Sequence, residues 1–231
     1  FCDVSDDTKL EEVYLPSTLE TMASYTFTRC RNIKRFYGNN KFVTDDGYSL
    51  AIENYNNLGK KYIVHFASAA GLTSYTIPEG IQGIENYCFY GAEDLKSLAI
   101  PATVDAIGPS AFEEAYNIES LSGPNVLDDN RSYVVDGRLL YVADKGLTKY
   151  IVPDSVTILS YGVFSDKQYV EEIHMSDNVT HVDGYGYLFC HSPKLKTVTI
   201  SARFQNFELD PFGCQESKGG GAGKCESLET V

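Results

Sequence analysis

The sequence predicts a solenoid, a right-handed and β-rich chain path in which coils of about 23 residues stack on one another. The first observation behind this prediction is repetition. The apolar residues that follow Leu72 return after Leu95 with the same spacing, 23 residues later, and Ile118 begins the next copy. The second observation is burial, because a single coil cannot hide its apolar positions whereas stacked coils hide them from each other.

The copy beginning at Leu95 shows what each place in a coil does. Its recurring residues are Leu95, Leu98, Ile100, Pro101, Val104, Ile107 and Phe112. The fourth and sixth places alternate with period two, so they share the inward face of a short strand. The proline ends hydrogen bonding to the next coil, and the later apolar residues point inward from the return path. Repetition at this period is typical of a leucine-rich-repeat solenoid, a β-rich α/β coil with a concave sheet of short strands and an irregular convex side carrying short strands or 3₁₀ turns.

The same pattern divides the chain into nine coils, the last of them incomplete. The coils start near residues 10, 33, 72, 95, 118, 147, 170, 195 and 228. A length of 231 residues fits one elongated domain over residues 1–231. The chain starts at Phe1 rather than Met and ends early in a coil without a cap, so we expect a processed or excised piece.

Two insertions, at about residues 39–71 and 126–146, resemble each other. Each contains an Asp-Gly pair between alternating apolar residues, at residues 46–47 and 136–137. This pair is a strong hairpin signal, because the tight turn needs positive φ. We therefore predict two inserted β-hairpins that project from the solenoid, the first with a further strand over residues 61–66.

These motifs resemble the BspA-like leucine-rich-repeat family of bacterial cell-surface proteins. The resemblance rests on copies of Leu-x-x-Ile-x-Ile-Pro-x-x-Val-x-x-Ile-x-x-x-Ala-Phe, best seen over residues 95–112, and it covers roughly residues 10–231. It implies a non-catalytic module at the cell surface or outside the cell, used for adhesion or interaction with a host. The implied partners are extracellular or host proteins, with glycans as a further class. Family members share a scaffold rather than a ligand.

The composition argues against several classes of partner. The formal net charge is −13, from 19 basic and 32 acidic residues. Nucleic acid and anionic membrane surfaces are disfavoured, because phosphate binding needs clustered Lys and Arg. No apolar run approaches the ~18 residues of a membrane span, so we expect no membrane insertion by this segment.

The six cysteines leave their pairing open. Cys30 takes a place that alanine takes in other coils, so we interpret it as a small core residue. Cys214 and Cys225 flank a glycine-rich loop and are a candidate disulfide, and Cys190 with Cys214 is the rival pairing. We expect no metal or cofactor, since there is no Cys-x-x-Cys pair and the four histidines fall in different coils.

Three motifs have stronger interpretations as turns or loops than as sites. The glycine-rich segment 218–224 does not match a phosphate-binding loop, which would need glycine at Lys218 and a hydroxyl at Cys225. The pairs Asp45-Asp46 and Asp128-Asp129 suit calcium, but aspartate in such positions is more often a turn former.

The third and fifth places of each strand should form the exposed concave surface. The residues proposed here as ligand-binding are Glu12, Tyr14, Arg35, Tyr37, Ser74, Thr76, Lys149, Glu172, His174, Thr197 and Thr199. Tyrosine and arginine anchor many interfaces, so Tyr14, Arg35 and Tyr37 form the predicted hot spot. The alternative interpretation is that all of these are ordinary exposed strand residues.

Catalysis has little support in the sequence. Glu172 and His174 lie on one face of a strand and suit acid–base chemistry, but no nucleophile or oxyanion donor is identified beside them, so we favour a solvated surface pair. We therefore predict a non-enzymatic, extracellular protein-binding or adhesion module. The alternative is a structural spacer region of a larger surface protein whose other domains carry the activity.

Overall fold

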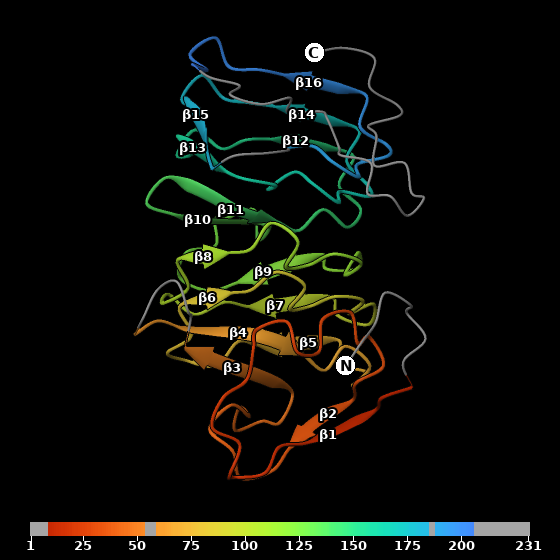
Figure 1. Ribbon diagram of the computed structural model, residues 1–231. Coiled ribbons are helices and arrows are strands. Elements are labelled where there is room, and N and C mark those ends of the chain that lie inside the picture. The colour runs from red at the N-terminus through yellow and green to blue at the C-terminus, as the bar shows by residue number, and fades with distance from the viewer. Residues whose placement is uncertain (1–8, 54–58, 185–187, 206–231) are drawn as a thin grey trace. The chain divides into compact units, whose positions relative to one another are not determined.

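The structure, a computed structural model, describes residues 9–53, 59–184 and 188–205, and its regular elements there are all strands (Figure 1). The strands are β1 (Glu12–Tyr14), β2 (Arg35–Tyr37), β3 (Ser49–Glu53), β4 (Lys61–Phe66), β5 (Ser74–Thr76), β6 (Gly83–Ile84), β7 (Ser97–Ala99), β8 (Ala106–Ile107), β9 (Ser120–Ser122), β10 (Ser132–Val135), β11 (Arg138–Val142), β12 (Lys149–Ile151), β13 (Ile158–Ser160), β14 (Glu172–His174), β15 (His181–Asp183) and β16 (Thr197–Thr199). The described residues contain no helix, so the helical part of the predicted α/β coil is not found there. The return path of the coils instead holds short strands, which are β6, β8, β13 and β15.

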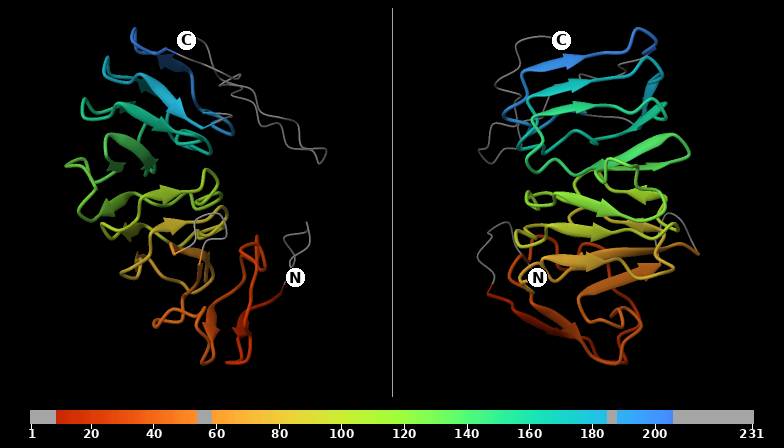
Figure 2. Two further views of the ribbon diagram at one scale, coloured as in Figure 1. Left: turned by 60° about the vertical axis from the view of Figure 1, so that its left-hand side comes forward. Right: turned by 180° about the vertical axis from the view of Figure 1, so that it is seen from behind.

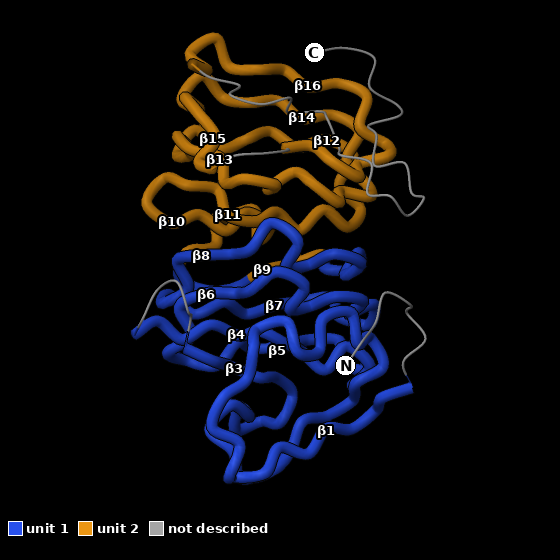
Figure 3. The backbone as a smooth tube through the Cα atoms, viewed as in Figure 1, with its two compact units in different colours: residues 1–118, 122–124 blue, residues 119–121, 125–231 orange. Residues whose placement is uncertain are grey.

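The chain divides into two compact units (Figure 3). Unit 1 holds residues 1–118 and 122–124, and unit 2 holds residues 119–121 and 125–231. Each is described by itself below. The expectation of a single domain over residues 1–231 stays a prediction.

In unit 1, successive coils add parallel strands to two separate sheets. β5 pairs with β7 through Ser74 opposite Ser97 and Thr76 opposite Ala99, a step of 23 residues. The second sheet has the order β3-β4-β6-β8, in which β4, β6 and β8 are parallel. β1 and β2 form a further parallel pair in the first two coils. Unit 1 is therefore a stretch of β-solenoid.

Unit 2 repeats this arrangement (Figure 2). β12, β14 and β16 form one parallel sheet, and the other sheet has the order β10-β11-β13-β15. β12 and β14 are in register at a step of 23 residues, and β14 and β16 at a step of 25, because two extra residues separate these coils. Unit 2 is thus a second stretch of β-solenoid.

The antiparallel strands of the two insertions begin the second sheet of each unit and do not stand apart from the coils. β10 and β11 are joined by Asp136 and Gly137, whose φ angles of 51° and 75° are those of a tight hairpin turn. In unit 1, the turn at Gly47 carries a single antiparallel bridge between Val43 and Leu50. β3 pairs instead with β4, which continues into the parallel sheet. The prediction of projecting hairpins therefore needs this correction.

The core of each unit contains stacked phenylalanines. Phe89 and Phe112 have ring centroids 5.0 Å apart and planes 13° apart in unit 1. Phe164 and Phe189 have centroids 5.6 Å apart and planes 5° apart in unit 2. All four rings are buried, as the repeat pattern predicts. The last phenylalanines of the pattern, Phe207 and Phe212, lie outside the described residues, as does the coil starting at residue 228.

Candidate binding surface

In β1, β2, β5, β7, β12, β14 and β16 the middle residue is buried, and the first and third residues are exposed or partly exposed. This burial follows the predicted alternation, because Val13, Phe36 and Tyr75 are buried between exposed neighbours in unit 1. We call the outward residues of these strands the strand face. It includes all eleven residues predicted as ligand-binding, namely Glu12, Tyr14, Arg35, Tyr37, Ser74 and Thr76 in unit 1 and Lys149, Glu172, His174, Thr197 and Thr199 in unit 2.

Tyr14 and Tyr37 form the most prominent contact on the strand face of unit 1. The register of β1 and β2 places them opposite each other, with ring centroids 5.5 Å apart in an edge-to-face arrangement. They remain 60% and 42% exposed, although both are large aromatic side chains. Two exposed tyrosines in contact offer a partner a preformed apolar surface with hydroxyl groups at its edge.

Charged side chains lie beside this tyrosine pair. Glu12 is opposite Arg35 in the register of the same two strands. The Arg35 guanidinium lies 5.6 Å from the ring centroid of Tyr48, which restrains it against the turn that follows β2. The three residues of the predicted hot spot, Tyr14, Arg35 and Tyr37, therefore lie on the same face of the paired strands β1 and β2.

The strand face of β5 and β7 differs from this cluster. Its outward residues are Ser74 and Thr76, which are exposed, and Ser97 and Ala99, which are partly exposed. These side chains are small, so the surface offers hydroxyl groups and little else. It would permit a partner's backbone to approach closely.

In unit 2, polar contacts connect all three strands of the face. Lys149 Nζ and His174 Nε2 each lie 3.2 Å from Glu172 Oε2, and His174 Nδ1 lies 3.0 Å from the Thr199 hydroxyl. The hydrogen bond from His174, and then that from Lys149, lowers the pKa of the Glu172 carboxyl below its ordinary value. The sequence could place Glu172 beside His174, but Thr199 reaches it only through the register between coils.

This network contains two of the groups that a catalytic centre for acyl transfer would use. A threonine hydroxyl beside an imidazole resembles a nucleophile with its base, but acyl transfer also needs oriented donors for an oxyanion. The strands that carry Thr199 and His174 use their backbone groups for sheet pairing. The arrangement suits recognition of polar groups at a surface.

Both aspartate pairs are turn formers. Asp46 Oδ1 accepts hydrogen bonds from Thr44 Oγ1 at 2.6 Å and from the Tyr48 N–H at 2.9 Å. Asp129 Oδ1 accepts from the N–H groups of Arg131 and Ser132, each at 2.9 Å. Across the described ranges, no group of three metal-ligating side chains comes together.

Among the described cysteines, two take part in disulfide bonds. Cys30 and Cys190 are both bonded and both buried, so Cys30 is more than the small core residue that the repeat pattern predicts. The alanines at the same place in other coils indicate a small buried side chain, but they do not indicate a disulfide. The candidate pair Cys214 and Cys225 lies outside the described residues. Cys88 is a free thiol, and burial raises its pKa well above the ordinary value.

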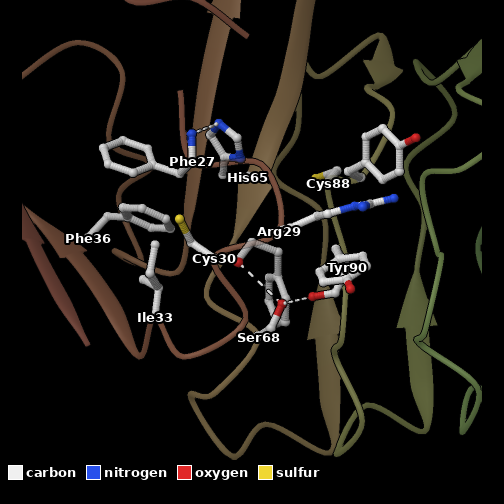
Figure 4. A pocket seen from close by; sticks show the side chains of 11 residues that line it. Phe27, Arg29, Cys30, Ile33, Phe36, His65, Ser68, Cys88 and Tyr90 are labelled. Carbon is white, nitrogen blue, oxygen red and sulfur yellow. Dashed lines mark hydrogen bonds between the residues drawn. The ribbon is translucent and has the colours of Figure 1, made fainter. Parts of the chain in front are cut away.

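A small cavity in unit 1 is lined by His65, Cys88 and neighbouring side chains (Figure 4). His65 Nε2 accepts a hydrogen bond from the Phe27 N–H at 3.2 Å. Burial lowers the pKa of His65 to about 3, opposed in part by its hydrogen bond with the Ser24 backbone. Ser68 Oγ donates to the Tyr90 carbonyl at 2.7 Å. These hydrogen bonds satisfy polar groups that are buried around the cavity, so we interpret His65 as a structural residue.

Within the part of the chain that the structure describes, no helix has the length and apolar character needed to cross a membrane.

Comparisons with solved structures find several bacterial proteins that match this chain. A leucine rich cell surface protein from Faecalibacterium prausnitzii gives a TM-score of 0.56 at 16% identity, covering 82% of this chain and 48% of its own. A leucine-rich repeat protein from Eubacterium ventriosum gives 0.46 at 19% identity, covering 82% and 54%. The pneumococcal vaccine antigen PcpA gives 0.42 at 15% identity, covering 85% and 41%. The chain thus spans about half the length of the first of these proteins.

No curated protein gives a significant match to the sequence. A family model does match, however, and it describes a BspA type leucine rich repeat region in six copies. The matched residues are 5–63, 60–137 and 141–218, which together cover most of the chain. Together with the 23-residue step of its parallel strands, this match shows that the chain belongs to the BspA type leucine-rich-repeat family.

Proposed function

We propose that this chain is a non-catalytic, protein-binding module of a bacterial surface protein, and that it acts in adhesion to extracellular or host proteins. The observation that carries the proposal is the exposed Tyr14–Tyr37 contact on the strand face of unit 1. Large aromatic side chains at the centre of a rigid surface are the usual anchors of protein interfaces. The pairing of β1 with β2 fixes the backbone that carries the two tyrosines, so less conformational entropy is lost when a partner binds.

A location outside the cytoplasm is part of this proposal. Cys30 and Cys190 are disulfide-bonded, and structural disulfides persist mainly in oxidising environments. The F. prausnitzii protein of similar fold is described as a cell surface protein. Both observations support a surface location for this chain.

The proposal is tested by an array of matrix proteins and glycans at pH 7.5. We expect wild-type chain to bind at least one protein and the Tyr14→Ala, Arg35→Ala, Tyr37→Ala triple variant to lose that binding. Tyr25→Ala is the matched control, because Tyr25 is a 55% exposed tyrosine of unit 1 outside the three-residue strands. Circular dichroism confirms that each variant is folded.

The alternative function is that of a structural spacer in a longer surface protein, with activity in other domains. The small, hydroxyl-bearing surface of β5 and β7 favours it, since this part of the strand face has no anchor residue. Absence of any bound protein on the array would support the spacer. Binding that survives in the triple variant would move recognition away from Tyr14 and Tyr37.

A further inference from the structure

The polar contacts across β12, β14 and β16 form a row whose charge depends on one histidine. Lys149 and His174 both contact the same oxygen of Glu172, each at 3.2 Å. The three side chains are 51%, 30% and 45% exposed, respectively, so water and a partner can reach them. The row crosses the strands, and the sheet pairing of β12 with β14 fixes its geometry.

Protonation of His174 would change both the charge and the hydrogen-bonding pattern of this row. A neutral imidazole donates from one nitrogen and accepts at the other, whereas the cation donates from both. With the proton on Nε2, neutral His174 donates to Glu172 and accepts from the Thr199 hydroxyl, 3.0 Å from Nδ1. In the cation, Nδ1 donates to Thr199, whose own hydroxyl hydrogen is then free for a partner.

The charged groups near His174 lie on two strands. Among the described residues these are Glu172 on its own strand, which contacts His174, and Lys149 on β12, which contacts Glu172; β16 presents the uncharged Thr197 and Thr199. Lys196 and Glu171, beside the row, form their own ion pair at 2.7 Å. Histidine is the side chain that ordinarily changes charge between pH 5 and 8. The row therefore has no net charge when His174 is neutral and one positive charge when it is protonated.

An exposed aliphatic side chain lies next to this charge. Ile151 is opposite His174 in the register of β12 and β14 and is 63% exposed. A cation beside an aliphatic surface complements a peptide that has a carboxylate next to an apolar side chain. A sulfated glycan would instead favour clustered Lys and Arg, and Lys149 is the one such residue of this row.

We propose that the polar row of Lys149, Glu172 and His174, together with the neighbouring Ile151, binds an acidic, partly apolar peptide segment of a protein partner. The binding is tighter when His174 is protonated. The proposal rests on the proposed function, since it names the class of partner for one part of the strand face. It adds a dependence on pH that a static adhesive surface lacks.

The test uses a fluorescein-labelled peptide of alternating glutamate and valine, with fluorescence anisotropy at pH 5.5 and 7.5 in low salt. Exposed ion pairs contribute little, so we expect the Kd of the full chain to be about threefold to fivefold lower at pH 5.5. His174→Gln should show no such difference beyond that of the probe itself. Glu172→Gln should bind at pH 7.5 nearly as tightly as wild type does at pH 5.5, since it leaves Lys149 without its counter-ion.

His181→Gln is the matched control, because His181 is an exposed histidine of the other sheet of unit 2. It should keep the full pH difference. An equal pH difference in wild type and His174→Gln would overturn the proposal. Binding of a sulfated oligosaccharide in place of the peptide, with the same loss in His174→Gln, would overturn the choice of partner. A partner found on the array at pH 7.5 together with no His174-dependent peptide binding would overturn this inference and leave the proposed function standing.

Discussion

The hydroxyl oxygens of Ser49 and Tyr75 lie 2.8 Å apart, and both side chains are buried in unit 1. The contact joins β3 of the insertion to β5 of the following coil. Unit 2 repeats it between Ser132 and Tyr150 at 2.7 Å. In each unit the serine also contacts a residue of the preceding turn, which is Thr44 in unit 1 and Asp129 in unit 2. The same serine–tyrosine contact thus attaches the insertion of each unit to the following coil.

Removing the tyrosine hydroxyl should destabilise each unit without leaving a cavity. Tyr75→Phe and Tyr150→Phe delete one hydrogen bond and keep the ring, so each should lower the free energy of unfolding by about 1 kcal/mol. Chemical denaturation measures the change. Tyr25→Phe, at a 55% exposed tyrosine, is the control and should change stability by less than about 0.5 kcal/mol. If the buried variants match that control, these hydroxyl contacts do not contribute to stability.

The phenylalanine stack makes a larger contribution. Phe112→Ala should cost about 3–5 kcal/mol, because it removes a ring that stacks on Phe89 and leaves a cavity. Phe164→Ala should cost a similar amount through its contact with Phe189. Urea denaturation measures both. A cost under ~0.5 kcal/mol, typical of a surface change, would show that the repeat pattern is assigned wrongly.

The sequence predicted the coils well because their recurring residues are large and widely spaced. Leu98 and Phe112 are buried, as the pattern requires, and the three-residue strands alternate as expected. It allowed for short strands on the return path but did not predict which of them pair to form the second sheet. β6 contains only Gly83 and Ile84, which is too short for any alternation to show. The Tyr62 ring lies over Gly83, where an added Cβ would come within 2.5 Å of it.

The sequence predicted which strand positions carry the candidate surface residues, but not which of their side chains are in contact. Tyr14 and Tyr37 have the same place in successive coils, so their contact follows once the coils stack in register. Thr199 and His174 likewise share a place in successive coils, across a step of 25 residues, but the pattern does not show that their side chains make contact. Two places after Phe27, Phe112 and Phe164 the chain has positive φ, although the residues there are Arg29, Glu114 and Asp166. Because positive φ is uncommon for residues other than glycine, the sequence gives no signal for a turn at these positions.

Two glycines mark where the chain leaves a coil to begin an insertion. Gly38 and Gly123 have φ angles of 115° and 133°, and an added Cβ would lie 2.1 Å from the carbonyl oxygens of Leu15 and Ile100. Other coils have an aliphatic residue at this place, such as Ile100 itself. Gly38→Ala and Gly123→Ala should each cost about 3 kcal/mol or more, from backbone strain plus the clash.

The matched control for these glycines is Gly71→Ala. Gly71 has a φ of 71°, and no atom lies within 4 Å of its added Cβ, so strain acts there without a clash. It should cost about 1 kcal/mol. Thermal or urea denaturation compares the three variants. Equal costs at all three positions would mean that close backbone approach contributes nothing at Gly38 and Gly123.

His65 should make the stability of unit 1 depend on pH. Burial lowers its pKa in the folded state to about 3, against an ordinary value of 6.5. The unfolded chain therefore binds a proton more readily, and stability is full above pH 6.5 and falls as the pH drops toward 3. At pH 5 the expected loss from this residue is about 2 kcal/mol.

The measurement is urea denaturation of wild type and His65→Gln at pH 7 and pH 5. Glutamine can still accept from the Phe27 N–H but does not titrate, so the variant should lose less stability between these pH values by about 2 kcal/mol. The comparison cancels the carboxylates, which titrate in both proteins. Parallel pH profiles for wild type and His65→Gln would show that protonation of His65 does not oppose folding in this range.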